Sequence, residues 1–440
     1  MTRLEKLYGL VLLVIFAGIV VHAPISVGFG TLFPDYSLLI KSWKEILLVI
    51  ATSMAVIIVS RRGLWKQLWD DVILRLIALY AALYIVLSVV LYKGLSATVA
   101  GLAIDLRYLL FFTLVYVLMK IAPAYRWYIG WTCAFGAFVV VTFAVIQLFL
   151  PADTLKYLGY GAQTIAPYMT VDQNASFIRV NSTLRGPNPL GAYAVIVLTL
   201  ATAFSLSNIK RLNTPRIRYF VYWLAFASTV ALWISYSRSA LVAAIGAATF
   251  VVVVKLAPKV SRRGWLVAFA SMFALIGGLA LARDTSFVST VILHDNPDTG
   301  SSVTSNDDHV TSLNQGLARA LAQPFGGGVG STGSASLLGD NGLIIENQYL
   351  FVAHESGWLG LGIFIAIFVL ILQRLWQRKH DYMALGLFAS GIGLAFIGLV
   401  LPVWADDTVA IIWFGLAAVV VAGKEDYGYP KTNKKATRTT

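Results

Sequence analysis

The sequence is poor in cysteine, with Cys133 the only one among its 440 residues. A single cysteine permits neither an intrachain disulfide nor a cluster of thiolate metal ligands. Because Cys133 lies within an apolar run, we interpret it as a small buried side chain. The cysteine content therefore excludes a disulfide framework and a cysteine-based metal centre.

Charged residues are also scarce, at 12% of the chain, whereas hydrophobic residues make up 58%. Soluble domains contain about 25% charged residues, so this composition excludes an ordinary soluble globular protein. Apolar runs of about 18 residues or more recur along the chain, and each is long enough to cross a bilayer. We therefore expect an all-α polytopic membrane protein, with residues 1–440 forming a single integral-membrane domain.

The apolar runs predict about twelve transmembrane helices separated by short polar segments. We place these helices at residues 7–25, 38–60, 71–92, 97–119, 127–149, 190–208, 217–236, 239–257, 264–282, 347–373, 382–401 and 406–423.

Basic residues gather in alternate loops and therefore predict the orientation of the chain. They follow the second, fourth, sixth, eighth and tenth runs and recur in the tail at 424–440. The positive-inside rule makes this side cytoplasmic and places both termini there. The net charge of +13 is then a topology signal, so no nucleic-acid partner is needed to explain it. We expect the tail to be a solvated, basic cytoplasmic segment.

Two segments on the opposite, outer face are long, at about 151–189 and 284–346. Loops of this length are usually functional or disordered, and we expect short helices or re-entrant pieces in both. The run TSLNQGLARALAQP in the second segment has apolar residues at helical spacing and stops at Pro324. It predicts an amphipathic helix that lies over the outer mouth of the bundle.

Two arginines stand at the outer face, against the general charge bias. Arg185 lies in NSTLRGPNPLGAY before the sixth run, and Arg238 lies in ISYSRSALVAA at the turn between the seventh and eighth. Arginine presents a planar fork that suits bidentate binding of phosphate. Alternatively, each arginine pairs with a loop carboxylate or extends to lipid headgroups. The pair suits a lipid-linked diphosphate.

Ionisable residues also occur within or beside the apolar runs. Asp105 and Arg107 lie inside the fourth run, on different faces of the predicted helix, so each needs a partner on another helix or a substrate. At the start of the second run, Lys41 and Glu45 are spaced to pair with each other. Lys44 beside them either reaches a phosphate or extends to the headgroups.

The turn PFGGGVGSTG places Gly328, Gly330 and Gly333 in a G-x-G-x-x-G pattern. A dinucleotide site is excluded, because no βαβ unit surrounds the pattern and it falls on the outer side. The glycines supply bare backbone for close approach to a ligand, or they form a tight turn after the preceding helix.

Four segments together resemble the O-antigen ligase and O-antigen polymerase superfamily. These are STLRGPNPLGAY, SYSRSAL, ARALAQPFGGGVGSTG and ENQYLFVAHESGWLGLG. The resemblance implies a multi-span glycosyltransferase at the outer face of the bacterial inner membrane. It also implies a glycan donor linked to undecaprenyl diphosphate, with a glycan or lipid as the acceptor and the membrane lipids as surroundings.

Within this resemblance, Arg185 and Arg238 match the arginines thought to hold the carrier diphosphate. The His-Asn of the family stands here as Glu346-Asn347, so glutamate replaces histidine. Glu346 or His354 would then be the catalytic base, while Arg107, Lys44, Asn347 and Tyr349 are candidate substrate contacts. The family implies neither metal nor cofactor. The glutamate slightly favours a repeat-unit polymerase over a ligase that acts on lipid A-core or a protein O-oligosaccharyltransferase.

A secondary transporter or flippase with twelve spans is the alternative from another class. Transporters bind their substrates near the bilayer midplane, often between broken helices of related halves. The polar residues of this sequence concentrate at the outer ends of the predicted spans, which favours surface chemistry.

Overall fold

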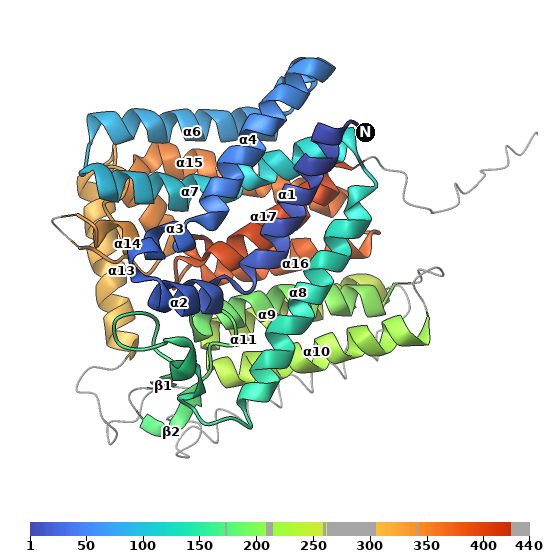
Figure 1. Cartoon of the computed structure of the whole chain (residues 1–440), viewed down its shortest axis with the longest axis vertical. Coiled ribbons are helices and arrows are strands. Elements are labelled where there is room, and N and C mark those ends of the chain that lie inside the picture. The colour runs from blue at the N-terminus through green and yellow to red at the C-terminus, as the bar shows by residue number, and fades with distance from the viewer. Residues whose placement is uncertain (172–173, 208–213, 258–260, 262–304, 340–341, 424–440) are drawn as a thin grey trace, which may run out of the picture.

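The computed structural model describes residues 1–171, 174–207, 214–257, 261, 305–339 and 342–423. Within these ranges the chain is mostly helical, and the one sheet that they contain is a hairpin of two short strands (Figure 1). The predicted all-α class of membrane-type fold is therefore confirmed at this level.

The elements run in chain order through long helices, short helices and one hairpin. The helices are α1 (Arg3–Ile19), α2 (His22–Leu32), α3 (Ser37–Lys41), α4 (Trp43–Arg62), α5 (Trp65–Trp69), α6 (Val72–Val90), α7 (Leu95–Ile121), α8 (Tyr125–Gln147), α9 (Pro187–Ser205), α10 (Pro215–Ser235), α11 (Arg238–Leu256), α13 (Ser305–Ala322), α14 (Gly333–Ser336), α15 (Gln348–Gln377), α16 (Tyr382–Ile397) and α17 (Asp407–Ala422). Three-residue to five-residue 3-10 helices are η1 (Pro34–Tyr36), η2 (Thr154–Leu158) and η5 (Val403–Ala405), and the strands are β1 (Met169–Val171) and β2 (Asn174–Arg179).

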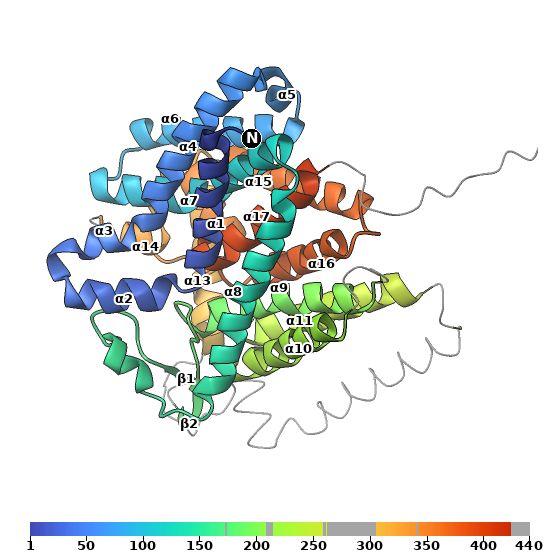
Figure 2. The ribbon, with the colours of Figure 1, turned by 45° about the vertical axis from the view of Figure 1, so that its right-hand side comes forward.

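Eight of the described helices are long and apolar enough to cross a membrane, namely α4, α6, α7, α8, α9, α10, α11 and α15. The first predicted span is instead a broken pair, because α1 and α2 meet at an angle of 83° (Figure 2). The last two predicted spans correspond to the shorter apolar helices α16 and α17. The span predicted at 264–282 lies outside the described residues.

Several helix starts are capped by short polar side chains. The hydroxyl of Thr2 accepts a hydrogen bond from the amide of Glu5, and the Glu5 carboxylate accepts one from the amide of Thr2. Asp71, Asp381 and Asp406 accept amide hydrogen bonds at the starts of α6, α16 and α17. These caps satisfy amide groups that have no partner inside the helix.

Helix α17 lies at the centre of the bundle, since every one of its residues is buried. A helix that is apolar on all sides is stable only when other helices surround it. Trp413 and Phe414 of α17 pack against Trp404, with ring centroids 5.3 and 5.1 Å apart. Gly415 leaves room for the rings of Phe16 and Phe111, and a side chain at this position would displace them. The core thus joins α1, α7 and α17.

Contacts between basic and acidic side chains tie together one end of the bundle, which we call the basic end. Arg62 at the end of α4 bonds Glu5 at the start of α1, and Arg374 near the end of α15 bonds Asp71 before α6. Arg126 of α8 also pairs with Asp381 before α16. The loops that carry these basic residues, which the charge pattern assigns to the cytoplasmic side, therefore lie together at one end of the bundle.

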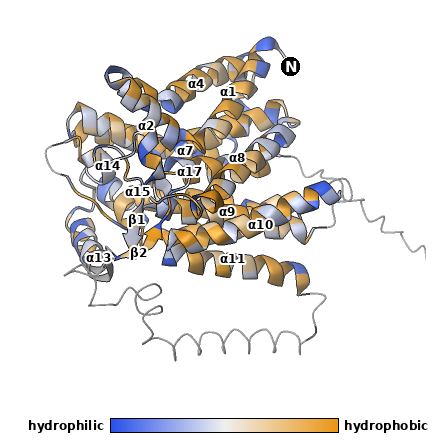
Figure 3. Ribbon diagram, turned by 60° about the horizontal axis from the view of Figure 1, so that its bottom comes forward, coloured by the Kyte–Doolittle hydropathy of each residue, from blue (hydrophilic) through white to orange (hydrophobic). Residues whose placement is uncertain are grey.

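The opposite end carries α2, α3, the β1–β2 hairpin, α13 and α14, and we call it the loop end (Figure 1). The prediction of short helices in segment 151–189 is only partly right, because the 3-10 helix η2 is followed by an antiparallel hairpin. The amphipathic helix predicted before Pro324 is α13, which packs on α15 and carries more hydrophilic residues than the bundle helices (Figure 3). Residues 284–304 of the second segment lie outside the described residues.

Candidate functional site

A cluster of charged and titratable side chains lies towards the loop end, at the starts of α2, α4 and α17 and within α7. It comprises His22 of α2, Lys44 and Glu45 of α4, Arg107 of α7 and Asp407 of α17, and we call it the charge cluster. Lys44, Arg107 and Asp407 are each at least nine-tenths buried. Charges so far from water are costly unless they are paired or bind a ligand.

Asp407 is the centre of the charge cluster. Its Oδ2 lies 3.1 Å from Nζ of Lys44, 3.6 Å from Nε2 of His22 and 3.8 Å from a terminal nitrogen of Arg107. As the first residue of α17, Asp407 is also favoured by the partial positive charge at the helix N-terminus. Its other oxygen, Oδ1, is buried without a hydrogen bond among the described residues.

The pairing predicted between Lys41 and Glu45 is wrong. Oε1 of Glu45 lies 3.2 Å from Nζ of Lys44 and 3.7 Å from a guanidinium nitrogen of Arg107. The ammonium of Lys44 is buried between Glu45 and Asp407 and does not extend to a surface. Helical spacing suggested Lys41 as the partner, but the cations that face Glu45 are its neighbour Lys44 and Arg107 of α7, which is remote in sequence.

Arg107 contacts groups on other elements of the fold, as its position inside an apolar run requires. One terminal nitrogen donates a 2.7 Å hydrogen bond to the carbonyl oxygen of Ala405, and another faces Asp407 and Glu45. Its Nε is buried without a hydrogen bond in the described part of the chain. Arg107 thus holds η5 and the start of α17 in place while retaining an unused donor.

Arg185 adds an exposed positive charge beside the buried cluster. It lies within electrostatic reach of His22 and Asp407, and its side chain is exposed to solvent. No hydrogen bond or ion pair joins its guanidinium to another residue that the structure describes. The loop that carries Arg185 is anchored two residues earlier, where Thr183 donates a 2.6 Å hydrogen bond to the carbonyl of Val20.

The two arginine motifs predicted from the sequence pack against each other. A Cβ on Gly191, in the motif of Arg185, would lie 2.8 Å from Cβ of Ala240, in the motif of Arg238. Arg179 of β2 joins them further, because it donates to the carbonyl of Ser235 and to Oδ1 of Asn188. Arg238 is the first residue of α11 and is half-buried, with a partner within the protein. The starts of α9 and α11 therefore belong to one region.

Asn347 and Tyr349, predicted as substrate contacts, are occupied by the fold. Oδ1 of Asn347 caps α15 by accepting from the amides of Tyr349 and Leu350, and its Nδ2 donates to the carbonyl of Leu399. The Tyr349 hydroxyl donates to the carbonyl of Ala395. Through these bonds both residues position α15.

The start of α15 and the charge cluster are connected through the turn at 398–406. Asn347 bonds the carbonyl of Leu399, and Oε1 of Gln348 accepts from the amide of Trp404. The same turn continues to Ala405, which binds Arg107, and then to Asp407. One short turn therefore fixes Glu346, the residue before Asn347, relative to the buried charges.

The two candidate bases differ in their surroundings. Glu346 is half-buried beneath α13, and its amide donates a 3.0 Å hydrogen bond to the hydroxyl of Ser312. Glu346 has a further interaction within the protein. His354 is buried deeper, beside the glycine turn, and its Nδ1 has no hydrogen bond among the described residues. The basic side chains of Arg319 and Lys93 act on it electrostatically.

The glycine turn binds a side chain of this protein. Amides of Gly330 and Thr332 donate to Oε1 of Glu355, at 3.0 and 3.3 Å. Glu355 is fully buried. A Cβ on Gly330 would lie 2.2 Å from the carbonyl oxygen of Ala97, and its φ of +78° disfavours other residues. Of the two roles predicted for the glycines, the tight structural turn is the one observed.

The turn also inserts into a break in α15. Gly357 has φ 67° and ψ −175°, which interrupts the helix. Backbone groups around the break are satisfied by the turn, because the amides of Gly327 and Gly328 donate to the carbonyls of His354 and Glu355. The amide of Trp358 donates to the carbonyl of Pro324. The glycine-rich segment and the broken helix are therefore one structural unit.

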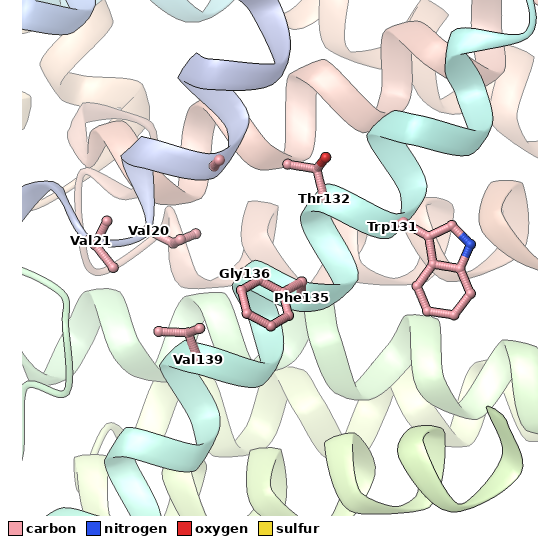
Figure 4. A pocket seen from close by; sticks show the side chains of 8 residues that line it. Val20, Val21, Trp131, Thr132, Phe135, Gly136 and Val139 are labelled. Carbon is pink, nitrogen blue, oxygen red and sulfur yellow. The ribbon is translucent and has the colours of Figure 1, made fainter. Parts of the chain in front are cut away.

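An apolar groove of about 500 Å³ lies between α1 and α8. It is lined by Ala17, Val20, Val21, Trp131, Thr132, Phe135, Gly136 and Val139 (Figure 4). Val21 directly precedes His22 of the charge cluster, and the carbonyl of Val20 holds the loop of Arg185 through Thr183. The groove thus borders the segment that carries His22.

Sequence reasoning missed Asp407, Glu355 and the role of His22. The pair Asp406-Asp407 at the start of an apolar run was a signal, since a membrane helix seldom carries two acids there. Glu355 follows His354 within an apolar run and carried the same signal. Within the described ranges, no three His, Cys, Asp or Glu side chains gather as a metal site requires.

Comparison with models of known protein families and with curated proteins finds no match for this chain. The resemblance drawn from the sequence motifs therefore rests on those motifs alone.

Proposed function

We propose that the protein is a membrane glycosyltransferase of the O-antigen ligase and polymerase type. It would transfer a glycan from undecaprenyl diphosphate to a hydroxyl acceptor at the outer face of the bacterial inner membrane. The proposal includes twelve spans with both termini in the cytoplasm, and hence a loop end that faces outwards. The basic end, with its gathered arginines and lysines, supports this orientation.

The observation that carries the proposal is the convergence of Lys44, Arg107 and Arg185 on one region from segments distant in sequence. Two of these cations are buried around Asp407, and the exposed Arg185 adds a guanidinium without a pairing partner among the described residues. Because Asp407 and Glu45 already pair with the two buried cations, the exposed Arg185 is the group that would bind the negative charge of a diphosphate. Because charge develops on the departing diphosphate, fixed cations stabilise the transition state.

The apolar groove between α1 and α8 supports a lipid-linked donor. A polyprenyl chain needs an apolar surface that is continuous with the site of its phosphates, and the groove includes Val21, beside His22. We assign the polyprenyl chain of the carrier to this groove and its diphosphate to the region of Arg185 and Arg238.

Glu346 is the base in this proposal. Its carboxylate would accept the proton from the acceptor hydroxyl as the oxygen attacks the anomeric carbon and the diphosphate leaves. The glycosidic bond forms as the bond from sugar to phosphate breaks, and attack from the opposite face inverts the anomeric centre. His354 is the alternative base, but it lies deeper and beside the glycine turn. The replacement of histidine by Glu346 favours a polymerase slightly over a ligase.

A proton-coupled transporter is the second candidate, because α15 is broken at Gly357 next to two buried acids, Asp105 and Glu355. Broken helices with buried ionisable groups are typical of secondary transporters. Purified protein in proteoliposomes, supplied with lipid-linked donor on one side only, separates the two. Formation of a new glycosidic bond supports the transferase, whereas movement of the donor without bond formation supports the transporter.

A further inference from the structure

Two carboxyl groups, Asp105 of α7 and Glu355 of α15, meet in the interior of the bundle. Asp105 is 5% exposed and Glu355 is fully buried. Their side chains lie within hydrogen-bonding reach of each other. Neither residue belongs to the charge cluster around Asp407, and glycosyl transfer as proposed above does not use them.

Each carboxyl group has one oxygen without a hydrogen-bond donor in the described part of the chain. These are Oδ2 of Asp105 and Oε2 of Glu355, and both are buried. Oε1 of Glu355 already accepts two amide hydrogen bonds from the glycine turn. A carboxylate offers only acceptors, so two ionised groups in contact would repel and would leave both oxygens unsatisfied.

The surroundings supply too little positive charge to hold two anions. Arg107 is the cation that acts on Asp105, but its two terminal nitrogens are engaged with Ala405, Asp407 and Glu45, which leaves only its Nε. From α6 and α7 the pair is faced by the buried tyrosines Tyr80, Tyr84 and Tyr108, which are neutral. Lys93 and Arg319 act on the neighbouring His354 instead.

We propose that Asp105 and Glu355 share a single proton, which fixes the glycine turn in the break of α15. The proton would lie between the two oxygens that otherwise have no donor, so that one carboxyl group donates to the other. Glu355 would hold the amides of Gly330 and Thr332, and the turn would in turn cap the backbone groups freed at Gly357. The pair is then a proton site that connects α7, α15 and the segment leading to Glu346.

The sign of the pH dependence follows from this count of protons. At neutral pH the folded protein keeps one proton that the unfolded chain has released, because isolated carboxyl groups are ionised there. The stability that the shared proton contributes is greatest below the ordinary pKa of carboxyl groups, decreases as the pH rises through neutral, and is gone once the proton is removed. Loss of the proton would release the turn from α15.

Infrared spectroscopy of the purified protein in nanodiscs at neutral pH tests the proposal directly. The wild type should show the carbonyl stretching band of one protonated carboxyl group in a non-polar environment. Asp105→Asn and Glu355→Gln should each remove the band, because an amide then donates to the remaining carboxylate. Asp153→Asn is the matched control, since Asp153 is exposed and paired with Lys156, and it should leave the band unchanged.

Thermal unfolding between neutral and alkaline pH provides a second readout. The wild type should lose stability as the pH rises, and each of the two amide variants should lose this dependence while remaining folded. The absence of the band in the wild type, its persistence in both variants, or a stability of the wild type that does not change with pH would each overturn the proposal. Glycosyl transfer is not measured in either experiment, so failure of one account leaves the other intact.

Discussion

Lys44 and Asp407 form a buried ion pair, with 3.1 Å between Nζ and Oδ2, that joins the start of α4 to the start of the central helix α17. Helices remote in sequence are thus fixed to one another by charges where a membrane protein normally has none. The same aspartate also faces His22 and Arg107. The pair therefore organises the region to which we assign the carrier diphosphate.

Replacing Asp407 by Asn should destabilise the protein strongly. The variant leaves Lys44 and Arg107 buried beside the single carboxylate of Glu45, and breaking a buried pair costs about 3 kcal/mol or more. Thermal unfolding in detergent measures the loss. Glu45→Gln is the control, because the Glu45 side chain is 28% exposed and should cost less. Equal stability of Asp407→Asn and the wild type would show that the cluster does not hold α17.

Arg185→Ala should abolish glycan transfer with little effect on folding. Its side chain is exposed and bonds to no other residue that the structure describes, so its removal leaves no buried group unsatisfied. Arg185→Lys should restore only part of the activity, since an ammonium lacks the planar fork. Arg216→Ala, at the exposed start of α10 at the basic end, is the matched control and should retain full activity. Near-normal transfer by Arg185→Ala would remove this arginine from the site.

Glu346→Gln should lower kcat by about 100-fold or more, in the range that a general base contributes. KM should change little, because glutamine has nearly the same shape as glutamate. His354→Asn is the comparison, and its effect should appear mainly as lower stability, since His354 is buried beside the glycine turn. If turnover is lost in His354→Asn and kept in Glu346→Gln, the base is the histidine.

Gly330→Ala should disrupt the packing of the glycine turn. The new Cβ would lie 2.2 Å from the carbonyl oxygen of Ala97, at a φ of +78°, where a left-handed conformation alone costs roughly 1–2 kcal/mol. Gly362→Ala in α15 is the control, because nothing lies within 4 Å of its Cβ position. Its melting temperature should equal or exceed that of the wild type. A Gly330→Ala variant as stable as Gly362→Ala would contradict the observed role of the turn.

The helical class and most spans could be predicted from the sequence, because apolar runs of bilayer length leave few alternatives. Helix α13 could be predicted as well, through its apolar spacing and Pro324. The broken pair α1–α2 was missed, since the apolar run continues through its 83° bend. The hairpin β1–β2 was missed because three-residue and six-residue strands leave little periodicity.

The candidate site was only partly predictable, for a similar reason. The motifs identified Arg185 and Arg238 by local pattern, and the structure places their segments together. Lys44, Arg107 and Asp407 come from three helices far apart in sequence, and no spacing rule connects them. The partner of Glu355 is a turn 25 residues earlier that looked like a ligand-binding motif.

In the proposed reaction, the protein forms a glycosidic bond and breaks the bond between the sugar and the phosphate of a diphosphate-linked donor. The most direct test mixes the purified, detergent-solubilised protein with a glycan linked to undecaprenyl diphosphate and follows both products. Detergent removes any contribution from transport. We predict release of undecaprenyl diphosphate together with an enlarged glycan by the wild type and neither by Arg185→Ala. An intact donor after incubation with folded wild-type protein and a range of acceptors would contradict the account.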